Sequence, residues 1–159
     1  MPKSIRAAFA GSLAFVVANI VSNILFFQLG HAVLFDPELQ SAKVLDVLFR
    51  MEPRPLMFEN GLLYMAIAAG IGVVHGLVFM LVEPSLGRSR LQRGLWFAVV
   101  VWALMALFFE FHTPFNMLRE PLPLVGLELA FWAIVAAVEG LILSFVYGGS
   151  RRELATALG

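Results

Sequence analysis

The amino-acid sequence predicts an all-α integral membrane protein with four transmembrane helices. Hydrophobic residues make up 60% of the 159 residues and charged residues only 14%, and the mean hydropathy is +0.88. A soluble domain of this size has too small an interior for so much apolar surface. Four apolar runs fill most of the chain, and each is close to the ~20 residues that cross the hydrocarbon core of a bilayer. The first predicted partner is therefore the lipid bilayer.

The predicted helices cover residues 5–29, 61–82, 91–111 and 124–147. The first run is longer than the apolar region of a signal peptide and contains Asn19 and Asn23, so we expect it to remain as a helix. Between the first two runs, Asp36 followed by Pro37 is typical of a helix start. We expect a short amphipathic helix over residues 36–50, on the bilayer surface or over the bundle.

The second pair of runs resembles the first, which indicates a tandem duplication of a two-helix unit. The sequence EPRPL at residues 52–56 corresponds to EPLPL at residues 120–124, and each comes just before an apolar run. Later in those runs, VHGL at residues 74–77 corresponds to VEGL at residues 138–141. Because the order is the same in both halves, we expect a single membrane domain, residues 1–159, with repeats over residues 5–82 and 89–148.

Charge and cysteine content narrow the classes of partner. The formal net charge is zero, which argues against a nucleic-acid partner, and the absence of cysteine excludes disulfides and thiolate metal ligands.

Lys and Arg residues concentrate on one side of the predicted helices, so we expect both termini to be cytoplasmic in an inner or plasma membrane. These residues are Lys3, Arg6, Arg88, Arg90, Arg93, Arg151 and Arg152.

Two ionisable residues lie deep within predicted helices. His75 and Glu139 occupy equivalent positions in the two repeats, and each shares a helix face with small residues suited to helix packing. Those small residues are Gly72, Gly76, Ala136 and Gly140. Packing of the two faces against each other would bring the imidazole and the carboxylate together. The pair then serves either as a proton relay or ion-coupling site, or as a hydrogen-bonded pair that only fixes helix register.

A second polar group gathers at the outer ends of the predicted helices. Its nitrogen and oxygen ligands suit a divalent metal, and its two histidines suit an axially ligated haem. The alternative is a set of charges in the headgroup region with no bound species. The candidate ligands are His31, Glu59, Glu110, His112 and Glu128.

The first helix also has a polar stripe, Ser12, Asn19 and Asn23, which either lines a solute path or bonds to neighbouring helices.

These features leave three classes of function open. The sequence has no nucleotide-binding glycine motif, no nucleophile elbow and no calcium-binding loop of the EF-hand type, and it predicts no catalytic residue. The leading interpretation is an oligomeric ion- or proton-coupled transporter or channel-like protein. The alternatives are a non-catalytic or haem- or metal-holding subunit of a larger membrane complex, and a membrane metalloenzyme that uses the outer group.

Overall fold

The computed structural model describes residues 1–148, which are helical with no strand in that part of the chain. It contains four helical segments long and apolar enough to cross a membrane, in agreement with the predicted fold class. The first is α1 (Lys3–Ile24) continued by η1 (Leu25–Leu29), and the second is α5 (Gly61–Val82) continued by η3 (Glu83–Ser85). The third joins α6 (Arg90–Val101), η4 (Trp102–Ala106), α7 (Leu107–Glu110) and η5 (Phe111–Met117). The fourth is α8 (Leu122–Tyr147).

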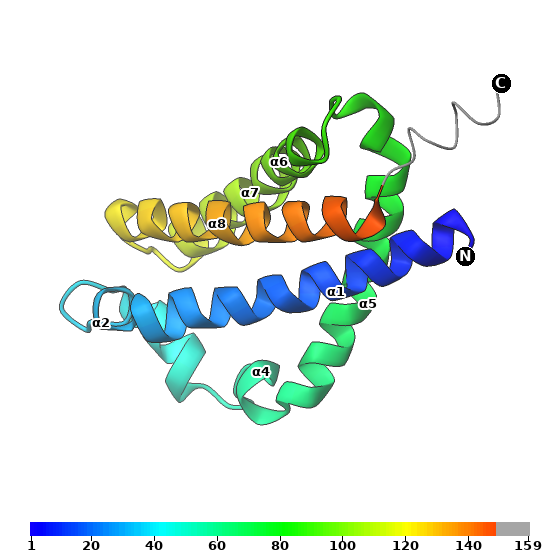
Figure 1. Cartoon of the computed structure of the whole chain (residues 1–159). Helices are drawn as coiled ribbons and strands as arrows, with labels where there is room; N and C mark the ends of the chain where they lie inside the picture. Colours follow the sequence, from blue (N-terminus) through cyan, green and yellow to red (C-terminus); the bar gives the residue numbers. More distant parts are fainter. Residues whose placement is uncertain (149–159) are drawn as a thin grey trace, which may run out of the picture.

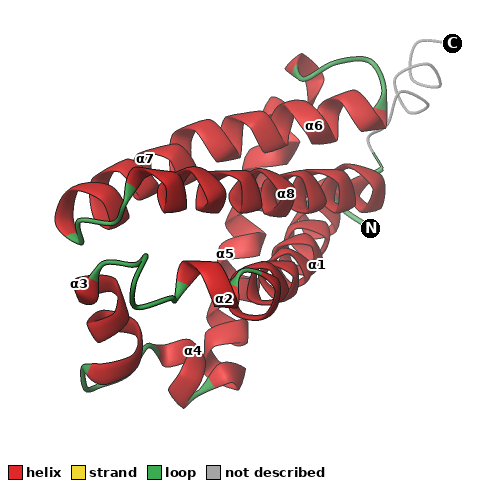
Figure 2. Cartoon of the chain, turned by 90° about the vertical axis from the view of Figure 1, so that its left-hand side faces the viewer, coloured by secondary structure: helices red, strands yellow, loops and turns green. Residues whose placement is uncertain are grey.

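The helices form two packed pairs, α1 with α5 and α6 with α8, and α1 also packs along α8 (Figure 1). The N-terminus, the α5–α6 connection and the end of α8 lie together at one end, which we call the terminal end. The opposite, distal end carries the shorter helices α2 (His31–Leu34), α3 (Ala42–Leu45) and α4 (Leu56–Glu59). From the terminal end towards the distal end, α5 diverges from α6 and α8 (Figure 2).

Glycines bring the helices of each pair into backbone contact. A Cβ atom on Gly72 would come within 2.5 Å of the Gly11 carbonyl oxygen, and one on Gly76 would overlap the Ala7 carbonyl. In the second pair, a Cβ atom on Gly94 would lie 2.8 Å from the Gly140 carbonyl oxygen. The glycines of α5 and α8 therefore do not contact each other, because Gly72 and Gly76 lie against α1 and Gly140 lies against α6. Each face packs on the partner within its own pair, where glycine allows the closest approach.

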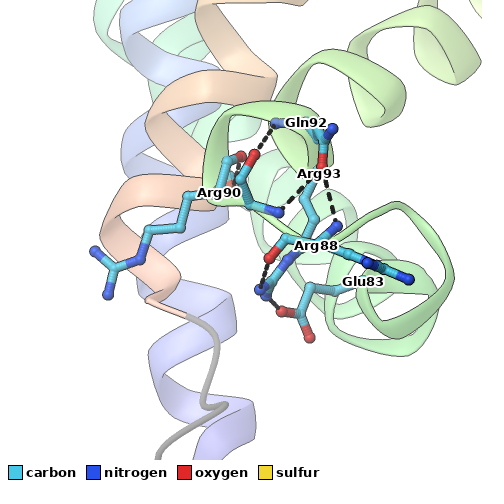
Figure 3. A network of polar contacts seen from close by, with 7 residues as sticks. Glu83, Arg88, Arg90, Gln92 and Arg93 are labelled. Atoms are coloured by element: carbon cyan, nitrogen blue, oxygen red, sulfur yellow. Dashed lines mark hydrogen bonds and ion pairs between the residues drawn. The ribbon is translucent and has the colours of Figure 1, made fainter.

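An apolar core fills the terminal end between the two pairs. Phe79 of α5, Phe97 of α6 and Leu143 of α8 are almost fully buried there, and the Phe79 and Phe97 rings meet edge to face at 5.2 Å. Next to this core, Arg93 forms an ion pair with Glu83 across the α5–α6 connection (Figure 3). Ser89 and Gln92 form a capping box at the start of α6.

The distal segment departs from its predicted helix. Residues Asp36 to Gln40 form a turn, and the helix begins only at Ala42, with Ser41 as its cap, before continuing as η2 (Asp46–Arg50). The expected start at Asp36 is therefore wrong. Long-range bonds explain the difference, because the Gln40 amide donates to Glu120 and the Ser41 hydroxyl donates to the Leu118 carbonyl. These bonds hold residues 40 and 41 against the connection before α8.

Candidate functional site

The structure brings His75 and Glu139 together across the gap between α5 and α8. His75 Nδ1 lies 2.6 Å from Glu139 Oε1, and the exposed fractions of the two side chains are 12% and 5%. A nitrogen and an oxygen at this distance require a proton between them. Residues 75 and 139 each precede a packing glycine, and successive helix residues are about 100° apart around the axis. The glycines therefore face α1 and α6 while the two polar side chains point towards each other.

A cavity of about 380 Å³ lies on the distal side of this pair. The polar residues of its lining include Asn19 and Ser22 of α1, Tyr64 of α5 and the pair itself. The Phe15 ring packs edge to face with the His75 ring, with 4.9 Å between the ring centroids. The Tyr64 hydroxyl donates to Asn19 Oδ1 at 2.8 Å, and Asn19 Nδ2 donates to the Phe15 carbonyl. Among the described residues that line this cavity, Tyr64 is the one titratable group besides the pair.

A larger cavity of about 870 Å³ adjoins the first at the distal end. Both cavities are lined by Asn19, Ser22, Tyr64, Phe109 and Trp132, so the polar lining runs from one to the other. The larger cavity also contains three buried carboxylates, from Glu110 of α7, Glu120 of the connection before α8, and Glu128 of α8. One oxygen of each lies within 4.8 Å of the others. We call these three residues the carboxylate cluster.

Two donors hold the carboxylate cluster in place. Trp132 Nε1 donates to Glu110 Oε1 at 2.5 Å, and Gln40 Nε2 donates to Glu120 Oε1 at 2.6 Å. Burial raises the pKa of the Glu120 carboxyl and the charge on Glu110 raises it further, although the bond from Gln40 acts in the opposite direction. Arg119 adopts φ 61° just before Glu120, which turns the chain so that the Glu120 amide bonds to the Pro114 carbonyl.

The predicted outer group is only partly assembled. Glu110 and Glu128 meet, but His31, His112 and Glu59 are exposed and lie outside the carboxylate cluster. His112 stacks on Phe108 at 5.4 Å, His31 packs edge to face with Phe35, and Glu59 accepts a bond from the Arg54 amide. The structure therefore brings together two of the five predicted ligands, Glu110 and Glu128, and places His31, His112 and Glu59 elsewhere. Glu110 and His112 are two residues apart on a helix, which places them on different faces.

Two of the three residues of the polar stripe on α1 line the cavities, and the third lies in a helix contact. Asn19 lines both cavities and Asn23 lines the larger one, whereas Ser12 lies at the glycine contact with α5. Two predicted packing residues, Gly72 and Gly76, contact α1, while Ala136 lines the smaller cavity.

Sequence reasoning missed Glu120, Gln40, Tyr64 and Trp132 as site residues. Glu120 belongs to the second EPxPL motif, whose first copy places Glu52 in solvent, so the motif alone gave no sign of burial. Trp132 lies within an apolar run and so resembles core or lipid-facing bulk, yet its indole nitrogen donates to Glu110. A usable signal was the position of Trp132 one turn after Glu128 on α8, because residues four apart share a helix face.

Comparison with known protein families, curated proteins and solved structures found no match to this chain.

Proposed function

We propose that this chain is a multi-pass membrane protein that moves protons, or an ion coupled to protons, with His75 and Glu139 as its intramembrane coupling site. The observation that carries the proposal is the position of this pair at the inner end of the smaller cavity, where Asn19, Ser22 and Tyr64 interrupt a mainly apolar lining. His75 and Glu139 are the lining residues of α5 and α8 nearest the terminal end. A buried imidazole and carboxylate that share a proton are suited to proton transfer, because a change in charge on one group is compensated by the other.

Access to the pair is one-sided, which also supports transport. On the distal side, the two adjoining cavities supply polar side chains as far as the carboxylate cluster. On the terminal side, one turn beyond the pair, Phe79, Phe97 and Leu143 close the bundle with almost no exposed surface. A transporter needs a site that is open to one side at a time. The terminal core would therefore act as the closed gate in this state.

Self-association is part of the proposal. The side wall of the smaller cavity contains apolar residues that are 42 to 49% exposed, namely Ile67, Ile71, Met105 and Phe109. In a single copy these residues face the bilayer. A second copy would seal the cavity from lipid, and crosslinking in nanodiscs would detect it as a dimer or larger species through introduced cysteines at residues 67 and 105.

Proton flux into liposomes tests the proposal. Purified protein would be reconstituted with a trapped pH-sensitive dye, and a potassium diffusion potential would drive proton entry. We expect Glu139→Gln to abolish flux, because glutamine keeps the shape and a hydrogen bond but cannot exchange a proton. As a control, Glu59→Gln changes an exposed distal carboxylate and should retain full flux.

Two outcomes would contradict the proposal. Wild-type protein that moves no protons under this potential, or under an added gradient of sodium or chloride, is not a proton-linked transporter. If wild-type flux is present and Glu139→Gln keeps its rate and pH dependence, the pair is structural. In that case the variant should lose only about 0.6 kcal/mol of stability, the average of interhelical hydrogen bonds in membrane proteins.

A further inference from the structure

We propose that Glu110, Glu120 and Glu128 bind a hard divalent cation of the Ca²⁺ or Mn²⁺ class at the distal end of the helices. This inference is independent of the transport proposal, because binding to the purified protein requires no flux. The three residues come from separate parts of the chain, α7, the connection before α8, and α8 itself. Their exposed fractions are 1%, 3% and 8%, so the three carboxylates have little contact with bulk water.

The spacing of the carboxylates fits a single coordination sphere. Oxygen ligands lie about 2.3–2.6 Å from Ca²⁺, so two ligands of one ion are at most about 5 Å apart. One oxygen of each carboxylate lies within 4.8 Å of the other two. All three can therefore reach one ion with small side-chain adjustments.

A second observation points to a ligand at this place. Glu110 is almost completely buried, and its Oε1 accepts the bond from Trp132. Its Oε2 meets no N–H donor among the described residues, and the other hydrogen-bonding neighbour of this carboxyl group is a second acid, Glu128. A buried carboxylate oxygen without a donor is costly. A cation shared with Glu120 and Glu128 would satisfy this oxygen.

Charge balance leads to the same conclusion. No Lys, Arg or His forms an ion pair with the cluster in residues 1–148. Three carboxylates this close repel one another unless protons or a cation reduce their charge. A divalent ion leaves one formal negative charge, and the nearby donors Gln40 and Trp132 can stabilise it. Because the site offers only oxygen ligands, we expect calcium or manganese rather than zinc.

The larger cavity gives the ion a route and a water shell. It is lined by the cluster and by further polar side chains of η1 and η5, including Gln28 and Thr113. Water molecules in this space can complete the six to eight ligands that Ca²⁺ prefers.

Terbium luminescence provides a direct test, because Tb³⁺ replaces Ca²⁺ and is excited by a nearby indole. The Trp132 indole donates to a cluster carboxylate, so it is placed to sensitise a bound Tb³⁺. Detergent-purified protein stripped with EDTA should give saturable emission that Ca²⁺ and Mn²⁺ displace. Isothermal titration should give about one Ca²⁺ per chain. Trp132→Phe should lose most of the emission and, because the donor to the Glu110 ligand is lost with it, should also weaken calorimetric Ca²⁺ binding about tenfold.

Three ligand variants and a matched control locate the site. Glu110→Gln, Glu120→Gln and Glu128→Gln should each weaken Ca²⁺ binding at least about tenfold, a lower limit set by the effect of losing even supporting contacts. Glu52→Gln changes the equivalent glutamate of the first EPxPL motif, which is exposed, and should bind as wild type. The proposal is wrong if wild-type protein shows no saturable binding at millimolar Ca²⁺ or Mn²⁺. It is also wrong if the three variants bind as tightly as Glu52→Gln, and protons would then be what balances the cluster charge.

Discussion

The His75–Glu139 pair and the carboxylate cluster are both buried polar sites between the helices, but their charges are balanced differently. The pair joins a group that can be positive to one that can be negative, at 2.6 Å, and is complete within the chain. The cluster joins three acidic groups around one unpartnered oxygen. The comparison teaches that burial alone does not define a polar site. A site complete in itself is suited to passing a proton, whereas a group of like charges needs bound protons or a cation to balance it.

Removing one member of the His75–Glu139 pair should destabilise the protein, whereas removing one charge from the carboxylate cluster should stabilise it. The variant of the pair has the larger expected effect. His75→Ala leaves Glu139 buried without its partner, and we expect a loss of about 3–5 kcal/mol in the free energy of unfolding. The double variant His75→Leu with Glu139→Leu should recover most of this loss, because an apolar pair carries no unpaired charge. Unfolding in mixed micelles of a mild detergent and SDS measures the free energy of unfolding of the single and the double variant. A single variant that unfolds like wild type would show that the pair is not buried as described.

Trp132→Phe should produce the next largest effect. The change removes the donor to Glu110 Oε1 and leaves the acidic Glu128 as the hydrogen-bonding neighbour of that carboxyl group. We expect a loss of about 1–3 kcal/mol in the free energy of unfolding when EDTA is present. Trp102→Phe is the control, because it removes a neutral bond to the Leu129 carbonyl and should cost about 1 kcal/mol. Equal losses for the two variants would show that the buried Glu110 carboxylate carries no extra cost when it loses its donor.

Glu120→Gln should stabilise the protein in the absence of divalent cations. Glutamine can still accept the bond from Gln40, while one of three mutually repelling charges is removed. We expect the melting temperature in EDTA to rise by about 2–4 °C, the shift that 1 kcal/mol gives in a chain of this size. Calcium should then stabilise wild-type protein more than the variant. A lower melting temperature for the variant in EDTA would mean that the Glu120 charge is already balanced within the chain.

Tyr64→Phe should have the smallest effect on stability. Tyr64 lines both cavities, and its hydroxyl donates to Asn19 rather than to the His75–Glu139 pair or the carboxylate cluster. The expected loss is about 0.6 kcal/mol, and calcium binding should be unchanged. A loss above about 2 kcal/mol would indicate that Tyr64 is part of a larger coupled network, since network deletions exceed single-bond values.

Helix positions were predictable from the sequence because hydropathy and helix-terminal residues act locally. The predicted run 61–82 coincides with α5, and α6 begins at a local S-x-x-Q pattern, the capping box of Ser89 and Gln92. The start of the distal helix was not predictable, because bonds from Gln40 and Ser41 to residues 120 and 118 override the local preference of Asp36. The duplication and the membrane orientation stay predictions.

The two polar sites also differ in how far local sequence determines them. The sequence by itself determined four apolar helices and placed His75 and Glu139 next to packing glycines, since helix periodicity relates neighbouring residues directly. Only the tertiary structure decided which helices those glycines contact, and that Glu120 turns inward while Glu52, in the same motif, is exposed. The physical reason is that burial of a loop residue depends on groups far apart in the chain. Here those groups are Gln40, Pro114 and Glu110, and no local pattern around residue 120 encodes their positions.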